Sequence, residues 1–483
     1  MTGWEPVIGI EVHVELMTRS KMFCGCAVSF GDEPNTNVCP VCLGLPGALP
    51  VPNRQALDWI MAIGLALNCE ISERSVFHRK NYFYPDLPKN YQISQFDVPV
   101  CRDGHLDVVV DGETRRIGIE RAHMEEDTGK SIHVGEGGRI HAAESTRLDF
   151  NRSGVPLVEI VSKPDIRSAA EAKAYAQEVR SLVAELGVSD TKLEEGSIRF
   201  DANVSVRPEG QEAYGTKVEI KNMNSFRSLE HALAYEIDRQ IGVLEGDGVL
   251  VQETRHWHEE AGATHSMRVK EGSSDYRYFT EPDLVPMHMD RAWVESVRTG
   301  LPELPAARRA RYMEAGLDVD QAGILSDAPP AWRAIFDAAV IADAPARAAA
   351  NWLTGEVTAW MRRTGADPEA ISLSGPQLAE LVALVDEGTV SASAAKEVLE
   401  GVLSGEGDPR QVAESRDLIQ ISDTSALEEA VDEALAANPD AVANYQAGEV
   451  KVVGFLVGQV MRATQGKADP KVVNELLTAK LEG

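Results

Sequence analysis

The sequence predicts an α+β fold for its first 295 residues and two all-α parts after them. Alternating apolar and polar runs typical of strands recur up to residue 295, but helical patterns do not separate them regularly, as they would in a doubly wound sheet. From about residue 301 the strand pattern disappears, and Ala, Leu, Glu and Arg fill segments broken by Pro and Gly. We therefore expect three domains, at 1–295, 296–408 and 409–483.

The first part holds the clearest single elements. Period-two runs predict strands at 7–16 (VIGIEVHVEL), 105–120 (HLDVVVDGETRRIGIE), 197–207 (SIRFDANVSVR) and 216–226 (TKVEIKNMNSF). Helical spacing predicts helices at 53–68 (NRQALDWIMAIGLALN) and 168–187 (SAAEAKAYAQEVRSLVAELG). The second of these helices follows Pro164 and Asp165 and ends at Gly187, which are ordinary start and stop signals.

The remaining chain reads as helices throughout. The segment GPQLAELVALVDEGTVSASAAKEVLEGVL at 375–403 is interrupted by glycine, and the break SGEGDPRQ at 404–411 separates it from a last helical unit. That unit contains SALEEAVDEALAAN at 425–438 and PKVVNELLTAKL at 470–481. The break places the predicted boundary near residue 408.

Composition restricts the class of protein. Apolar residues make up 43% and charged residues 25%, as in a globular protein in water. The sequence shows no apolar run of about 18 residues and no basic leader, so we expect no membrane partner, no signal peptide and a cytoplasmic location. The formal net charge of −29 disfavours non-specific binding to phosphate backbones, although a local basic surface would suffice for nucleic acid.

Four of the six cysteines are clustered, as C-x-C followed by C-x-x-C: Cys24, Cys26, Cys39 and Cys42. Disulfides are rare in the cytosol, and paired thiolates joined by a turn-rich loop suit tetrahedral Zn²⁺. Unliganded or redox-active thiols are the alternative. Because four protein ligands leave no open position, the predicted zinc is structural.

Acidic residues recur within strand patterns. Glu11, His13 and Glu15 share one face of a predicted strand, and Glu159 stands alone in the apolar run VPLVEIVS. The segments RAHMEEDTGKS and LEEGSIRFDANVSVR add further acids, among them Glu125, Glu126 and Asp201. A solvated sheet face is the alternative for any one of them. Carboxylates converging from several strands would bind Mg²⁺, which commonly accompanies nucleotide phosphates.

Two further clusters suggest contacts with nucleotides or RNA. Rings alternate with cations in HRKNYFYPDLPKNYQ, a pattern that suits stacking on bases but also an ordinary strand and turn. Near the end of the chain, a basic group offers one candidate surface for nucleic acid, although its charge pattern alone favours a solvated helix face. Its members are Lys451, Arg462, Lys467, Lys471 and Lys480. A P-loop is excluded, because Met124 occupies the position of its first glycine.

Several long motifs together resemble one family over essentially the whole chain. They are IGIEVHVEL, HRKNYFYPDLPKNYQISQFD, HMEEDTGKS, DFNRSGVPLVEIVS, EEGSIRFDANVSVR, GTKVEIKNMNSF, DYRYFTEPDLVP and GKADPKVVNELL. In this order they resemble the B subunit of the glutamine-dependent aspartyl/glutamyl-tRNA amidotransferases, the GatB family.

The resemblance implies a fold and an activity. It implies a cradle domain related to glutamine synthetase and guanidino kinases, then a helical domain, then a YqeY-like tail that grips tRNA. The implied reaction uses ATP and Mg²⁺ to phosphorylate the side chain of misacylated Glu-tRNA(Gln) or Asp-tRNA(Asn). Ammonia then arrives through a channel from the glutaminase partner, which is the A subunit of such enzymes, and a small C subunit joins the two.

The resemblance also implies site residues, which are Glu11, His13, Glu125, Glu126, Glu159 and Asp201 for metal binding and catalysis. It implies that the four cysteines vary within the family, which fits a structural role. Two other functions stay open from the residues alone: a zinc-stabilised RNA-binding scaffold without chemistry, and a free-standing ligase acting on a small molecule.

Overall fold

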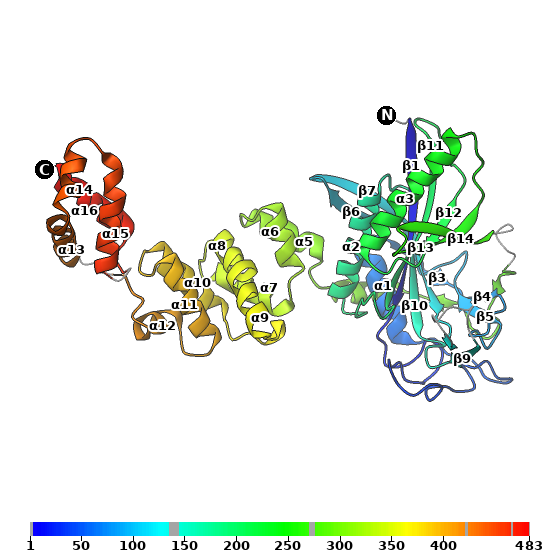
Figure 1. The fold of residues 1–483 in the computed structure, drawn as a ribbon. Helices are drawn as coiled ribbons and strands as arrows, with labels where there is room; N and C mark the ends of the chain where they lie inside the picture. The colour runs from blue at the N-terminus through cyan, green and yellow to red at the C-terminus, as the bar shows by residue number, and fades with distance from the viewer. Residues whose placement is uncertain (1–2, 135–143, 270–275, 421–423, 465–466, 483) are drawn as a thin grey trace. The chain divides into compact units, whose positions relative to one another are not determined.

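The computed structural model of this chain describes residues 3–134, 144–269, 276–420, 424–464 and 467–482. Asp275 of the motif DYRYFTEPDLVP and Gly466 of the motif GKADPKVVNELL lie outside them. The chain divides into two compact units, Met1–Leu304 and Pro305–Gly483 (Figure 1). The first unit mixes strands and helices and the second is helical, which confirms the predicted α+β class. The finer division at residues 295 and 408 stays a prediction.

A nine-stranded sheet forms the centre of the first unit (Figure 1). Its order is β14 (Ala263–Val269), β13 (Glu253–His258), β12 (Val218–Lys221), β11 (Ile198–Pro208), β1 (Trp4–Glu15), β10 (Pro156–Ser162), β7 (Glu113–Glu126), β6 (Cys101–Val110) and β2 (Glu70–Ile71). Adjacent strands are antiparallel except β12 and β13. The strand β1 therefore lies in the middle, between β11 and β10.

The two faces of the sheet differ in chemistry. Ile8, Ile10, Val12 and Val14 of β1 are fully buried in the apolar core. That core is shared with the helices α1 (Arg54–Ala66), α2 (Ala169–Glu185) and α3 (Phe226–Glu245), of which α2 and α3 pack against each other. Because side chains alternate along a strand, the polar residues between these apolar ones point to the opposite face.

Smaller sheets accompany the central one. They are β15–β4–β5 (Phe279–Thr280, His78–Asn81 and Tyr91–Ser94), β16–β3 (Met287–His288 and Arg74–Ser75) and β8–β9 (Lys130–Val134 and Ser145–Asp149). A bidentate ion pair ties the first together, since Arg79 donates to Glu281 at 2.6 and 2.8 Å. Among the described residues of this unit, the remaining helix is α4 (Arg291–Thr299), whose Trp293 Nε1 donates to Asp58 of α1.

The second unit contains two separate apolar clusters. Its longer helices are α5 (Pro305–Glu314), α6 (Val319–Ser326), α7 (Pro330–Ile341), α8 (Ala346–Asn351), α9 (Thr358–Thr364), α10 (Gly375–Asp386), α11 (Ala392–Leu403), α12 (Pro409–Ser415), α13 (Thr424–Ala437), α14 (Pro439–Gln446), α15 (Val453–Ala463) and α16 (Pro470–Glu482). A π-helix, η2 (Trp352–Val357), joins α8 to α9, and η3 (Pro368–Ala370) and η4 (Val450–Val452) are short 3₁₀ turns. Among the described residues, none of the helices has the length and apolar character needed to cross a bilayer.

Gly64 of α1 provides a test of how closely this helix packs on β6. A methyl group there would meet the Cys101 Sγ at 2.3 Å. We expect Gly64→Ala to lower the free energy of unfolding by about 1–3 kcal/mol through overpacking. Gly242 of α3 is the matched control, because an added Cβ meets nothing within 4 Å and Gly242→Ala should stabilise by up to about 1 kcal/mol. Urea denaturation measures both, and equal stabilities would contradict the predicted contact.

Candidate functional site: two metal-ligand groups on the polar face

His13, Glu159 and His123 lie side by side on three neighbouring strands. The register pairs His13 with Glu159 and Glu159 with His123, so the three side chains share the polar face. The Glu159 Oε2 lies 3.7 Å from the His13 Nε2 and 3.2 Å from the His123 Nε2. Glu159 is thus the carboxylate on which both imidazoles converge.

Glu125 completes the first ligand group, which we define as His13, Glu125 and Glu159. Ligand atoms of these three residues lie within 4.8 Å of one another. Glu125 is 4% exposed and accepts from Ser94 Oγ at 2.8 Å, and the Lys80 Nζ of β4 lies 3.9 Å from it. The hairpin β4–β5 therefore supplies a half-buried cation and a hydroxyl to this group.

Glu11, Asp201 and Glu219 form the second ligand group, again with ligand atoms within 4.8 Å. They come from β1, β11 and β12, and the register pairs Glu11 with Asp201. The Lys221 Nζ lies 2.6 Å from Asp201 and 3.1 Å from Glu219 and offsets part of their charge. Because β1 contributes to both groups, they are neighbours on one surface.

The charges of the first group depend on one another. Burial alone would raise the pKa of Glu159, but the His123 imidazole outweighs it and lowers that pKa to about 2. Burial likewise disfavours imidazolium at His123, but Glu159 raises the pKa of His123 to about 9. Glu125 is buried too, yet Lys80 and His123 hold its pKa well below the usual value. At neutral pH both carboxylates are therefore ionised and available as ligands.

Glu11 behaves differently. Burial and the negative charge of Glu159 raise the pKa of Glu11, whereas a hydrogen bond from the Asn203 Nδ2 at 2.8 Å lowers it. A carboxylate whose pKa is raised by neighbouring negative charge is stabilised by an added cation. A cation beside Glu11 would thus offset part of the repulsion that raises this pKa.

The structure does not bring Glu126 to either group. Glu126 follows Glu125 in β7, so its side chain points to the other face of the strand. There it is 3% exposed, forms an ion pair with the Lys89 Nζ and accepts from the Ile93 amide at 2.8 Å. Of the acids and the histidine predicted from the sequence, Glu126 alone stands apart from the ligand groups.

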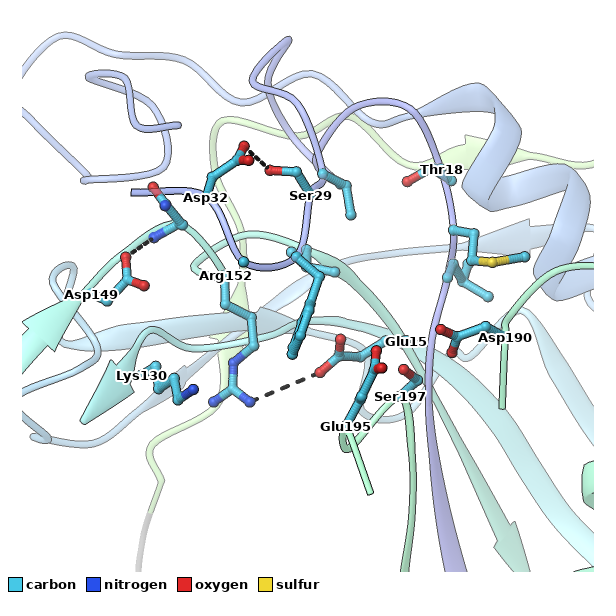
Figure 2. A pocket seen from close by; sticks show the side chains of 17 residues that line it. Glu15, Thr18, Ser29, Asp32, Lys130, Asp149, Arg152, Asp190, Glu195 and Ser197 are labelled. Atoms are coloured by element: carbon cyan, nitrogen blue, oxygen red, sulfur yellow. Dashed lines mark hydrogen bonds and ion pairs between the residues drawn. The ribbon is translucent and has the colours of Figure 1, made fainter. Parts of the chain in front are cut away.

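A cavity of about 430 Å³ continues the polar face beyond the end of β1 (Figure 2). Glu15 lines it, and Arg152 points toward Glu15 with 3.9 Å between Nη1 and Oε1 (Figure 2). The Asp127 Oδ2 lies 3.7 Å from the Arg152 Nε and 2.9 Å from the Arg199 Nη2. Burial and the charge of Asp127 raise the pKa of Glu15 to about 8.

The four clustered cysteines meet as predicted. Their sulfur atoms lie within 4.8 Å of one another, and all four are unpaired thiols. The Cys39 amide donates to the Cys42 Sγ at 3.1 Å, and the Nζ of the buried Lys21 lies 3.7 Å from the same sulfur. A hydrogen bond from Cys24, together with Lys21, lowers the pKa of Cys42 to about 4 despite burial. These contacts stabilise a thiolate, the form that binds zinc.

The predicted basic residues of the tail lie on its last elements. Lys451 (η4), Arg462 (α15) and Lys471 (α16) are exposed. Lys467 forms an ion pair with Asp417, and the Lys480 Nζ lies 2.5 Å from Asp432. Acidic neighbours therefore offset two of the five predicted cations.

The sequence did not indicate three residues of the polar face: the ligand Glu219 and the neutralising cations Lys80 and Lys221. Glu219 stands between Val218 and Ile220, so it carries the same signal as Glu159, a single acid within an apolar strand. The two lysines had no comparable signal, because their role follows from where their strands lie.

Oxygen ligands with one imidazole, arranged in two adjacent groups on a sheet, could hold divalent metal ions, as in a catalytic domain that uses them. A family model described as the GatB/GatE catalytic domain matches residues 6–295, and one described as the GatB domain matches residues 334–481. The chain is 52% identical over 480 residues to a protein of Moorella thermoacetica, covering 99% of this chain and 100% of that one. It is 50% identical over 482 residues to one of Geobacter sulfurreducens, covering 100% of both.

Both relatives are named as the B subunit of an aspartyl/glutamyl-tRNA(Asn/Gln) amidotransferase. The chain belongs to this family, the GatB family of amidotransferase components, as the resemblance implied. It is accordingly one component of an enzyme of the ligase class.

Proposed function

We propose that this chain phosphorylates the side-chain carboxylate of misacylated Glu-tRNA(Gln) or Asp-tRNA(Asn), using ATP and Mg²⁺, and then amidates it. The ammonia would come through a channel from a glutaminase partner, the A subunit, with a small C subunit joining the complex. The observation that carries the proposal is the pair of ligand groups on the polar face. The names of the relatives, which specify these tRNAs, support the choice of substrate.

The proposed chemistry would use both ligand groups. A carboxylate is a poor acceptor for ammonia, whereas its acyl phosphate carries a good leaving group. Mg²⁺, when bound, would neutralise the phosphate oxygens and align them for transfer. His13, Glu125 and Glu159 would hold one ion and Glu11, Asp201 and Glu219 another. Lys80, 3.9 Å from Glu125, is positioned to neutralise further charge beside the first ion.

Two further parts of the chain receive roles in this proposal. The thiolates of Cys24, Cys26, Cys39 and Cys42 would hold a structural Zn²⁺ with no open position for chemistry. The exposed cations of the tail would contact the phosphates of the tRNA, with Lys451, Arg462 and Lys471 contributing more than Lys467, whose charge Asp417 offsets. The proposed fold is a cradle related to glutamine synthetase and guanidino kinases, with a YqeY-like tail.

The complete complex tests this function. With ATP, Mg²⁺ and Glu-tRNA(Gln) or Asp-tRNA(Asn), we expect ADP to form only with the misacylated tRNA, and glutamine to yield the amidated product. ATP turnover with free glutamate and ammonia, without tRNA, would indicate a free-standing ligase instead. Binding of tRNA without any ATP turnover would indicate a scaffold.

Substitutions of two adjacent glutamates of β7 distinguish a role in metal binding from a role in packing. We expect Glu125→Gln to raise the Mg²⁺ concentration for half-maximal activity at least 10-fold, because it removes a proposed ligand. Glu126→Gln should leave that concentration unchanged, because the partner of Glu126 is Lys89 and not a proposed metal ion. It should lower the thermal midpoint, because the buried ammonium of Lys89 would lose its carboxylate partner. Titration of activity with Mg²⁺ measures this concentration for both variants. A larger increase in Glu126→Gln than in Glu125→Gln would show that Glu126 is the metal ligand, as predicted from the sequence.

A further inference from the structure

Lys21 is a fully buried lysine beside the cysteine cluster. It is 1% exposed, and its Nζ lies 3.7 Å from the Cys42 Sγ and donates to the Asn37 carbonyl at 2.8 Å and to the Phe150 carbonyl at 3.3 Å. These contacts use all three hydrogens of the ammonium group. Of the three acceptors, only the sulfur can carry a negative charge, so the thiolate of Cys42 is the group that offsets the buried cation.

The same ammonium joins the cysteine segment to a distant part of the chain. Asn37 lies in the loop between the two cysteine pairs, whereas Phe150 lies in the link between β9 and β10. Two further hydrogen bonds reinforce this connection, since the Asn37 amide donates to the Asn151 Oδ1 at 2.8 Å and the Phe150 amide donates to the Asn35 Oδ1 at 2.8 Å. The cysteine loop is therefore anchored to the segment that leads into β10.

That segment contains a tight turn at Gly154. Gly154 has a φ of +88°, and a Cβ there would meet the Cys42 Cβ and the Lys21 Cδ, both at 3.5 Å. Its amide donates to the Asp127 carbonyl at 2.9 Å, and its carbonyl accepts from the Met22 amide at 2.7 Å. The backbone at Gly154 is thus in contact with both the cysteine cluster and the residue that follows β7.

Two strands that carry ligands meet at this turn. Glu125 precedes Asp127 in the chain and lies near the end of β7, and Glu159 follows Gly154 and lies in β10. The two strands are paired here, with Leu157 opposite Glu125. Because packed elements move together, a shift of the turn would displace both carboxylates of the first ligand group.

We propose that Lys21 is a positioning residue that couples metal binding at the cysteine cluster to metal binding at the first ligand group. Four thiolates around one Zn²⁺ carry excess negative charge, which the ammonium would offset while it holds Phe150 and, through that link, the turn at Gly154. The inference rests on the proposed function, from which it takes both metal ions. It deepens that function by making the structural zinc a determinant of Mg²⁺ affinity.

Coupling between two binding sites is reciprocal, so it can be measured at the zinc site without any activity. Competition with a zinc chelator gives the Kd of the complete complex for zinc, with and without Mg²⁺. In the wild type we expect Mg²⁺ to lower this Kd about 5-fold or more.

Lys21→Met should raise the Kd for zinc about 10- to 100-fold, because the thiolate of Cys42 loses its cation. The substitution also breaks the link to Phe150, so Mg²⁺ should no longer change the Kd for zinc. In the same variant, the Mg²⁺ concentration for half-maximal ADP formation should rise about 5-fold or more.

The matched control is Lys192→Met, which removes an exposed lysine paired with Glu195 at 2.8 Å and should keep the wild-type values for both metal ions. Lys21→Met with wild-type zinc affinity, or with weaker zinc binding and an unchanged Mg²⁺ requirement, would overturn the inference. A wild-type Kd for zinc that is the same with and without Mg²⁺ would overturn it even if Lys21→Met fails to fold. A wild-type complex that holds no zinc, or forms no ADP with misacylated tRNA, would instead overturn the proposed function itself.

Discussion

Glu159→Gln is expected to lower the rate of amidation by at least about 100-fold. Glu159 is the carboxylate shared by His13 and His123, at 3.7 and 3.2 Å. An amide is neutral and a weaker ligand for Mg²⁺, so the substitution weakens the first ligand group and removes the charge opposite His123. Single-turnover conversion of Glu-tRNA(Gln) or Asp-tRNA(Asn) by the complete complex measures the effect, with ADP counted in the same samples.

A second readout distinguishes this effect from loss of the fold. Glu159 raises the pKa of His123 to about 9, so that pKa should fall in Glu159→Gln, which NMR titration of the imidazole can follow. Glu113→Gln is the matched control, because Glu113 is an exposed residue of β7 paired with Arg115. It should keep full activity. Activity within a few-fold of wild type in Glu159→Gln would remove this residue from the proposed metal site.

Cys42→Ser is expected to abolish zinc binding and to destabilise the first unit strongly. The Cys42 sulfur accepts hydrogen bonds from the Cys39 amide and from the buried Lys21 ammonium. A serine hydroxyl is neutral, so the substitution would leave the ammonium of Lys21 without the negative charge of the thiolate. Loss of a structural metal is among the changes that cost more than about 4 kcal/mol. Native mass spectrometry should show one zinc ion per chain in the wild type and none in the variant, and thermal unfolding should show a lower midpoint.

Cys69→Ser is the control for this experiment. Cys69 is buried outside the cluster, so this variant should keep its metal and lose only modest stability. A wild-type protein free of metal, or a Cys42→Ser variant with unchanged metal content and thermal midpoint, would contradict the proposed zinc site.

Local patterns in the sequence were sufficient for several features. The spacing of the cysteines predicted that they meet, since both pairs and their turns lie within one short segment. Alternation along β1 predicted that Glu11 and His13 share a face. The same rule, applied to Glu125 and Glu126, would have separated them without a structure, because consecutive residues of a strand point to opposite faces.

By itself, the sequence determined the α+β class, the family, the cysteine cluster and the presence of isolated acids within apolar strands. Only the tertiary structure decided which acids act together. Glu11 and Glu219 are more than two hundred residues apart, and His13 meets Glu159 only through the pairing of β1 with β10. Such partners depend on strand order and register, which are set by long-range packing of the core and leave no mark in the local pattern of residues.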